Sequence, residues 1–169
     1  MKIVLIEEMV SIKIFNAATN GVWFRRPKIN LEGVDSKYIE EYEDWEGKKC
    51  LRFNFEEYAK DHHELDCTID YPLSTKCDFK IILPENKWRP GEYVFNTEDI
   101  VDQVCKKYHE IYREESETLT KIDKPNPHLI NRGFSNGKWG IWGHDIGDLV
   151  LEEISLDTEK HRINLEIGS

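Results

Sequence analysis

No stretch of these 169 residues stays apolar over the roughly 18–20 positions that a membrane-spanning helix needs. The apolar start at Ile3 to Ile6 is interrupted by Glu7 and Glu8, short of the about 7–15 apolar residues of a signal peptide. Cysteine is also scarce, and the thiols at positions 50, 67, 77 and 105 form no C-x-x-C pair. These absences predict a cytoplasmic protein with reduced thiols, without a disulfide framework or a four-thiolate zinc site.

The sequence also lacks the common motifs of nucleophilic, nucleotide-dependent and zinc enzymes. It contains no G-x-S-x-G, no P-loop, no dinucleotide-binding glycine fingerprint and no H-E-x-x-H. We therefore expect a protein that is not an enzyme and that needs no cofactor.

Positive charge is in short supply, because 23 Lys and Arg face 33 Asp and Glu and leave a net charge of −10. Nucleic-acid affinity comes mainly from neutralised phosphates, so the charge predicts no nucleic-acid partner, and the missing apolar run predicts no membrane partner. A basic protein would instead be steered toward this chain. Solubility alone is the other explanation of the charge, and the sequence leaves both open.

The length fits a single domain over residues 1–169 with a substantial core. One long helix is expected over 97–118, because acids fill its first turns and its apolar residues recur at three- and four-residue spacing. Strands are expected at 50–55, 67–71 and 77–83, with Leu51, Phe53 and Phe55 facing inward. The sequence thus predicts an α+β fold, a mainly antiparallel sheet of about five to seven strands with one long helix packed on a face.

A β-hairpin is predicted at the C-terminal end of the chain. Alternation of apolar residues shifts by one position at Glu152 and Glu153, as a β-bulge would cause, and the turn falls at 157–160. The core should include Trp142, Leu149, Leu151, Ile154, Leu156, Ile163 and Leu165.

The segment 35–45 allows two structures. Tyr38, Ile39, Tyr42 and Trp45 would share one face of a short helix that ends at Gly47. The alternation of Tyr38, Glu40 and Tyr42 would equally suit a hairpin strand.

Residues 137–148 combine four glycines, two tryptophans and the adjacent pair His144 and Asp145. That pair resembles the metal-binding motif of HD-type phosphohydrolases, in which His109 and Asp157 would be the further ligands. Members of that family are all-helical, whereas the residues after Asp148 are strand-like. The simpler interpretation is that Asp145 and Asp148 bond backbone N–H groups in turns.

Three further patterns have more than one interpretation. Exposed Trp139 and Trp142 would make a ligand-binding module. His62, His63 and Glu64 are ligand-type residues without metal-site spacing, so solvated loop residues are expected there. The aromatic and basic stretch 23–28 suits single-stranded nucleic acid, but an edge strand that ends in a charged turn explains it as well.

Two acidic clusters remain. Five acids between positions 40 and 46 surround aromatic side chains, which predicts a partner-binding site made of Tyr38, Glu40, Glu41, Tyr42, Glu43, Asp44 and Trp45. On the long helix, Glu110, Glu114, Glu115 and Glu117 lie near the end where the dipole disfavours acids. They either serve a partner or pair with Lys106, Lys107 and Arg113.

The stretch from Gly140 to Glu152, followed by the expected hairpin, resembles the C-terminal signature of bacterial polymorphic-toxin immunity proteins. The resemblance covers about 30 residues and implies a cytoplasmic protein that binds a cognate toxin domain and neutralises it by occlusion. It also implies acidity where the toxin is a basic nuclease, and it transfers no catalytic residue. An acidic protein-binding inhibitor is therefore the leading hypothesis, with a His144 and Asp145 metal phosphohydrolase and a Trp-based binding module as alternatives.

Overall fold

The computed structural model describes residues 2–7, 9–15, 30–83, 97–120 and 133–169. Six strands in this part of the chain form the main sheet: β1 (Lys2–Ile6), β2 (Val10–Ser11), β5 (Glu64–Ile69), β6 (Cys77–Ile82), β7 (Val150–Asp157) and β8 (Arg162–Gly168). Their order is β1-β7-β8-β5-β6, and β2 also pairs with β7. Only β5 and β8 run parallel, so the predicted α+β class with a mainly antiparallel sheet is confirmed.

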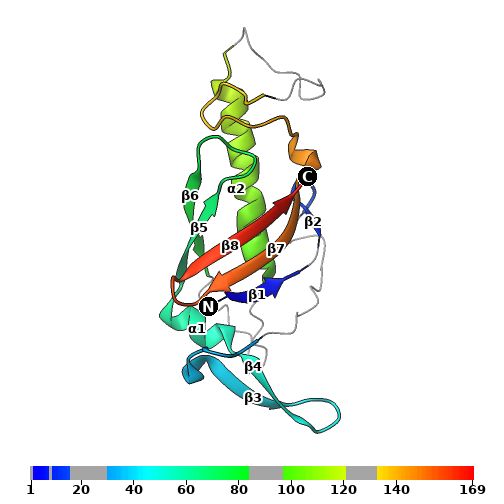
Figure 1. The fold of residues 1–169 in the computed structure, drawn as a ribbon, viewed down its shortest axis with the longest axis vertical. Coiled ribbons are helices and arrows are strands. Elements are labelled where there is room, and N and C mark those ends of the chain that lie inside the picture. The colour runs from blue at the N-terminus through cyan, green and yellow to red at the C-terminus, as the bar shows by residue number, and fades with distance from the viewer. Residues whose placement is uncertain (1, 8, 16–29, 84–96, 121–132) are drawn as a thin grey trace.

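The helix α2 (Thr97–Thr118) confirms the predicted bounds and lies across one face of the sheet (Figure 1). Its apolar stripe is buried, with Ile100, Val104, Tyr108 and Ile111 inaccessible to solvent. The Tyr108 hydroxyl donates to the Tyr71 carbonyl at 2.8 Å. Because burial of an amphipathic face supplies most helix stability, the stripe fixes α2 against the strands.

The C-terminal hairpin of β7 and β8 is also confirmed. Its register shifts between Leu151 and Glu153, where the apolar alternation changes phase. The Asp157 carboxylate accepts the N–H groups of Glu159 and Lys160, both at 3.1 Å, and so fixes the turn.

Most of the predicted core residues are buried, namely Leu149, Leu151, Ile154, Leu156 and Ile163. Two are only half-buried. Leu165 packs at the edge of the core, and Trp142 lies beside His144 with 5.4 Å between the ring centroids. The prediction of full burial is therefore wrong for Trp142 and Leu165.

Residues 35–53 contain no regular α-helix, so the helix expected over 35–45 is wrong and its alternative is right. A 3₁₀ turn, η1 (Ser36–Tyr38), leads into the two-stranded hairpin of β3 (Ile39–Glu43) and β4 (Lys49–Phe53). The Asp44 carboxylate accepts N–H groups from Glu46 at 3.0 Å and Lys48 at 2.9 Å. Gly47, with a φ of +75°, supplies the left-handed backbone that closes the turn.

The strand expected over 50–55 ends early, because Asn54 caps a helix that the sequence analysis missed. This helix, α1 (Phe55–Asp61), begins where the Asn54 side chain accepts the N–H of Glu57 at 3.0 Å. Phe53 and Phe55 are buried as expected, but Leu51 is 61% exposed, so the inward face assigned to it is wrong. The strands expected at 67–71 and 77–83 correspond to β5 and β6.

All four cysteines have free thiols, as predicted. Three are buried and Cys50 is half-buried. Burial raises the pKa of the Cys67 and Cys105 thiols to about 12, which keeps both as unreactive thiols at neutral pH.

Candidate functional site

The glycine- and tryptophan-rich loop, residues 133–149, is organised by a buried carboxylate. Glu115, only 3% exposed, accepts backbone N–H groups from Gly137, Trp139 and Gly140 at 2.7–3.2 Å, and the Ser135 hydroxyl as well. Burial raises the pKa of this carboxyl, but these donors outweigh burial and hold the pKa below its ordinary value. The fully hydrogen-bonded Glu115 carboxylate thus binds the loop to α2.

Two glycines of this loop are required by close approach. A Cβ on Gly137 would lie 2.5 Å from the Glu115 carboxyl carbon. A Cβ on Gly140 would lie 2.0 Å from the Ser74 hydroxyl, and its φ of +65° is also left-handed. Gly137 and Gly140 therefore serve close packing in this loop.

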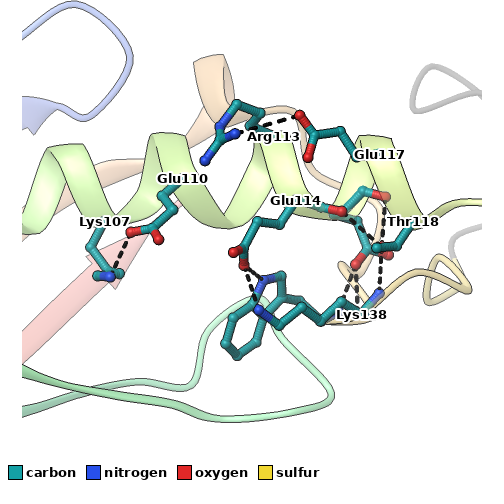
Figure 2. A network of polar contacts seen from close by, with 10 residues as sticks. Lys107, Glu110, Arg113, Glu114, Glu117, Thr118 and Lys138 are labelled. Carbon is teal, nitrogen blue, oxygen red and sulfur yellow. Dashed lines mark hydrogen bonds and ion pairs between the residues drawn. The ribbon is translucent and has the colours of Figure 1, made fainter.

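The other acids of α2 mostly form ion pairs along or beside the helix (Figure 2). Glu110 pairs with Lys107 at 2.5 Å, and Glu117 pairs with Arg113 at 3.5 Å. Glu114 accepts from the Lys138 ammonium and the Trp139 indole N–H, both at 2.8 Å. The ion-pair interpretation holds for Glu110 and Glu117, whereas Glu114 and Glu115 hold the 133–149 loop, a role that the sequence analysis missed.

His144 and Asp145 have structural contacts. Asp145 is the N-cap of η2 (Ile146–Asp148): its side chain accepts the N–H of Gly147 at 3.3 Å, and its own N–H donates to Asp148 at 3.0 Å. The His144 Nε2 lies 3.0 Å from the Tyr71 hydroxyl. The turn interpretation of Asp145 and Asp148 is therefore right, as Asp routinely caps helical turns.

The further ligands that the metal hypothesis needs do not form a metal site with His144 and Asp145 in the described part of the chain. His109 is exposed on α2, and Asp157 holds the β7–β8 turn. Within the described residues, no three or more His, Cys, Asp or Glu side chains are arranged to hold a metal ion. The α+β fold also differs from the all-helical fold of the HD-type enzymes.

The premise of the Trp-based binding module is wrong for both tryptophans. Trp139 is half-buried, bonded to Glu114 and packed on the core, and Trp142 is half-buried as well. The basic and aromatic stretch 23–28 lies outside the described residues.

Among the described residues, the exposed tryptophan lies at the turn of the β3–β4 hairpin. Trp45 is 90% exposed, and Tyr42 and Leu51 are exposed on the two strands that lead to it. Figure 1 shows the hairpin projecting from the end of the molecule beyond α1, away from the main sheet. Tyr42 and Leu51 lie on opposite faces of the hairpin, since their cross-strand partners are Cys50 and Glu41. An almost fully exposed tryptophan on a projecting hairpin is unusual on a monomer surface and typical of interaction sites.

The charges of the whole hairpin are more balanced than those of the acidic run 40–46 alone. Five acids lie between positions 40 and 46, but three cations return on or beside β4. Arg52 pairs with Glu40 and lies 5.1 Å from the Tyr42 ring centroid, while Lys49 pairs with Glu41 at 3.0 Å. The acids that remain fully presented beside the exposed tryptophan are Glu43 and Glu46.

The structure therefore divides the seven predicted partner-binding residues. Tyr42, Glu43 and Trp45 are exposed near the tip, Glu40 and Glu41 form cross-strand ion pairs, and Asp44 holds the turn. Tyr38 lies at the base, where its ring packs edge-on against Tyr58 with 5.2 Å between centroids.

An aromatic cluster at this base was missed by the sequence analysis. Tyr58 on α1 contacts Phe53 and Phe55, and its hydroxyl lies 2.8 Å from Nδ1 of His161 in the β7–β8 turn. His62, expected as a solvated loop residue, is half-buried and stacks on His161. No local sequence pattern connects these two histidines, because 99 positions separate them.

No family model, curated protein or solved structure matches this chain. No helix among the described residues is both long enough and apolar enough to cross a membrane.

Proposed function

We propose that this protein is a protein-binding inhibitor, of the immunity-protein type, and that the β3–β4 hairpin inserts into the partner it neutralises. The observation that carries the proposal is Trp45, 90% exposed at the tip of a projecting hairpin whose turn is fully hydrogen-bonded. Inhibition would occur in the cytoplasm of the producing cell and by occlusion, without catalysis.

A rigid, exposed aromatic residue is well suited to dominate a protein interface. Tryptophan buries a large apolar area on binding and is enriched among the residues that contribute most to affinity. The Asp44 carboxylate and Gly47 hold the turn before any partner arrives, so little conformational entropy is lost on association. Tyr42 and Leu51 are exposed on opposite faces of the hairpin, so a partner that encloses the inserted hairpin would contact both.

Charge would set the rate of encounter more than the final affinity. The net charge of −10 attracts a basic partner at long range, and Glu43 and Glu46 flank the anchor at short range. The resemblance of residues 140–152 to immunity proteins supports a basic toxin domain, such as a nuclease, as that partner.

The direct test is binding to the purified toxin domain encoded by the neighbouring gene, measured by calorimetry at low salt. We expect Trp45→Ala to raise the dissociation constant at least tenfold, because it removes the main apolar contact. This is a loss of about 1.4 kcal/mol in binding free energy. Met9→Ala, which truncates another exposed apolar residue far from the hairpin, is the matched control and should bind as the wild type does.

The charge part is tested with Glu43→Lys combined with Glu46→Lys, since Asp44 must stay to hold the turn. This variant should associate more slowly, and its rate should respond less to salt. Absence of any complex with the wild type would contradict the function. Unchanged affinity of Trp45→Ala would contradict the site alone.

A further inference from the structure

Two histidines from distant parts of the chain stack face to face beneath the hairpin. His62 ends α1, where its N–H donates to the Tyr58 carbonyl at 2.9 Å. His161 lies in the β7–β8 turn with a left-handed φ of 51°. Their ring centroids are 3.8 Å apart and their planes differ by 19°, so the two imidazoles are in van der Waals contact.

The groups around the stack are mostly committed to other partners. From η1, the Tyr38 hydroxyl donates to Asp61 at 2.8 Å and lies 3.4 Å from His62 Nε2, and Lys37 also pairs with Asp61. Asp157 of β7 acts on Tyr58 through its charge, and β5 contributes the backbone N–H of Asp66, which bonds the His161 carbonyl. Asp61, the carboxylate next to His62 in the chain, is therefore already shared by a lysine and a tyrosine.

A neutral imidazole suits this arrangement better than a charged one. When Nδ1 of His161 carries no proton, it accepts the hydrogen of the buried Tyr58 hydroxyl at 2.8 Å. A proton on Nδ1 would oppose that hydrogen, and the hydroxyl would have to rotate away within a buried site. Two charged imidazoles at 3.8 Å would in addition repel each other.

We propose that the His62–His161 stack is an acid-sensitive clasp, which joins α1 to the β7–β8 turn at neutral pH and opens when both rings are protonated. Histidine is the side chain whose charge changes in the mildly acidic range. Burial, followed by the charge of His161, lowers the pKa of His62, consistent with a stack that disfavours protons.

Opening the clasp would act on the hairpin through α1. Tyr58, the residue bonded to His161, also packs against Tyr38 and Phe53 at the base of the β3–β4 hairpin. Loss of the clasp would loosen that base, so pH would control how firmly the hairpin is held. This inference does not depend on what the hairpin binds.

The sign of the effect follows from linkage. Because the folded-state pKa of His62 is lowered, the unfolded chain takes up its proton first, and stability is lost as pH falls below about 6.5. Carboxylates with lowered pKa values lose their contribution only at more acidic pH, which separates the two effects.

The experiment is urea unfolding of the full chain at pH 7.5 and pH 5, together with NMR titration of the histidine ring protons. The folding equilibrium constant of the wild type should fall between pH 7.5 and pH 5, because the unfolded chain binds the His62 proton more tightly than the folded chain does. His161→Asn removes the ring and keeps a residue that tolerates the left-handed backbone. It should lose much less, and the pKa of His62 should rise toward its ordinary value.

His63→Asn is the matched control, since His63 is exposed beside His62 and should keep the wild-type dependence. His62→Gln gives an independent test if His161→Asn folds poorly. Its stability should change less between pH 7.5 and pH 5 than that of the wild type. Equal losses in the wild type and in both clasp variants would overturn the proposal. So would a His62 ring that titrates at its ordinary pKa in the wild type.

Discussion

The β3–β4 hairpin and the 133–149 loop contain the same kinds of residue and use them in opposite ways. Each combines a tryptophan, a glycine with positive φ and nearby acids. In the loop, Trp139 bonds Glu114 and its backbone bonds the buried Glu115. In the hairpin, Trp45 is almost fully exposed, and a Cβ on Gly47 would meet nothing within 4 Å.

The difference shows that composition alone does not identify a site. The loop holds more glycine and tryptophan, yet Gly137 and Gly140 are accounted for by close packing and by hydrogen bonds to Glu115 of α2. The hairpin keeps an apolar side chain in solvent, where it contributes nothing to folding. An exposed feature that folding does not explain is the better candidate for function.

The largest expected effect is a difference in stability between alanine variants of two leucines, one in the core and one on the hairpin. Leu151 is fully buried on β7, so Leu151→Ala should lower the free energy of unfolding by about 2–5 kcal/mol. Leu51→Ala, on β4, should change it by less than about 0.5 kcal/mol, because that side chain is mostly exposed. Urea denaturation followed by circular dichroism measures both, and similar losses would show that the hairpin is packed in solution.

The second effect concerns the charge that holds the 133–149 loop. Glu115→Gln replaces one acceptor oxygen by a donor that faces backbone N–H groups, so we expect a loss of about 2–4 kcal/mol. Glu117→Gln on the exposed side of the same helix should stay within about 0.5 kcal/mol of the wild type.

The pH dependence of that difference follows from the lowered pKa of Glu115. Its contribution is complete above the ordinary carboxyl pKa and is lost as pH falls through the lower folded-state value. The stability gap between the wild type and Glu115→Gln should therefore narrow from pH 7 toward pH 3.5. A gap independent of pH would mean that the carboxylate charge does not hold the loop.

Elements with a strong local pattern could be predicted from the sequence. The α2 stripe recurs at three- and four-residue spacing from Ile100 to Ile111, and the C-terminal hairpin alternates through a one-residue shift, so each pattern fits one kind of structure. The pattern of residues 38–45 fits a helix and a strand equally well. The hairpin is stabilised by the turn bonds of Asp44 and by the cross-strand pairs, which the local pattern does not show. The strand expected over 50–55 extends too far because Asn54, which caps α1, fits the alternation as one more polar strand residue.

The functional surface could be predicted only in part, because burial and pairing are set by contacts between distant positions. Trp45 and Tyr42 were identified, and the structure places both on the exposed hairpin. The roles of Glu115 and of the stacked histidines depend on partners 20 to 99 positions away in the chain, which no local spacing reveals. Two cross-strand ion pairs and the turn bonds of Asp44 likewise leave only Glu43 and Glu46 of the five acids without such a contact among the described residues.

The smallest predicted effect compares the two glycines directly. Gly47 and Gly140 both have positive φ, so alanine at either position carries a backbone strain of about 1–2 kcal/mol. Only Gly140→Ala adds a steric clash, since its Cβ would lie 2.0 Å from the Ser74 hydroxyl. We expect Gly140→Ala to lower the free energy of unfolding by about 1 kcal/mol more than Gly47→Ala does, measured by urea denaturation. Combining Gly140→Ala with Ser74→Gly, which removes the obstructing side chain, should abolish the part of the loss that comes from the clash. If the two alanine variants were equally stable, the 133–149 loop would be no more crowded than the hairpin, and the contrast between the two regions would fail.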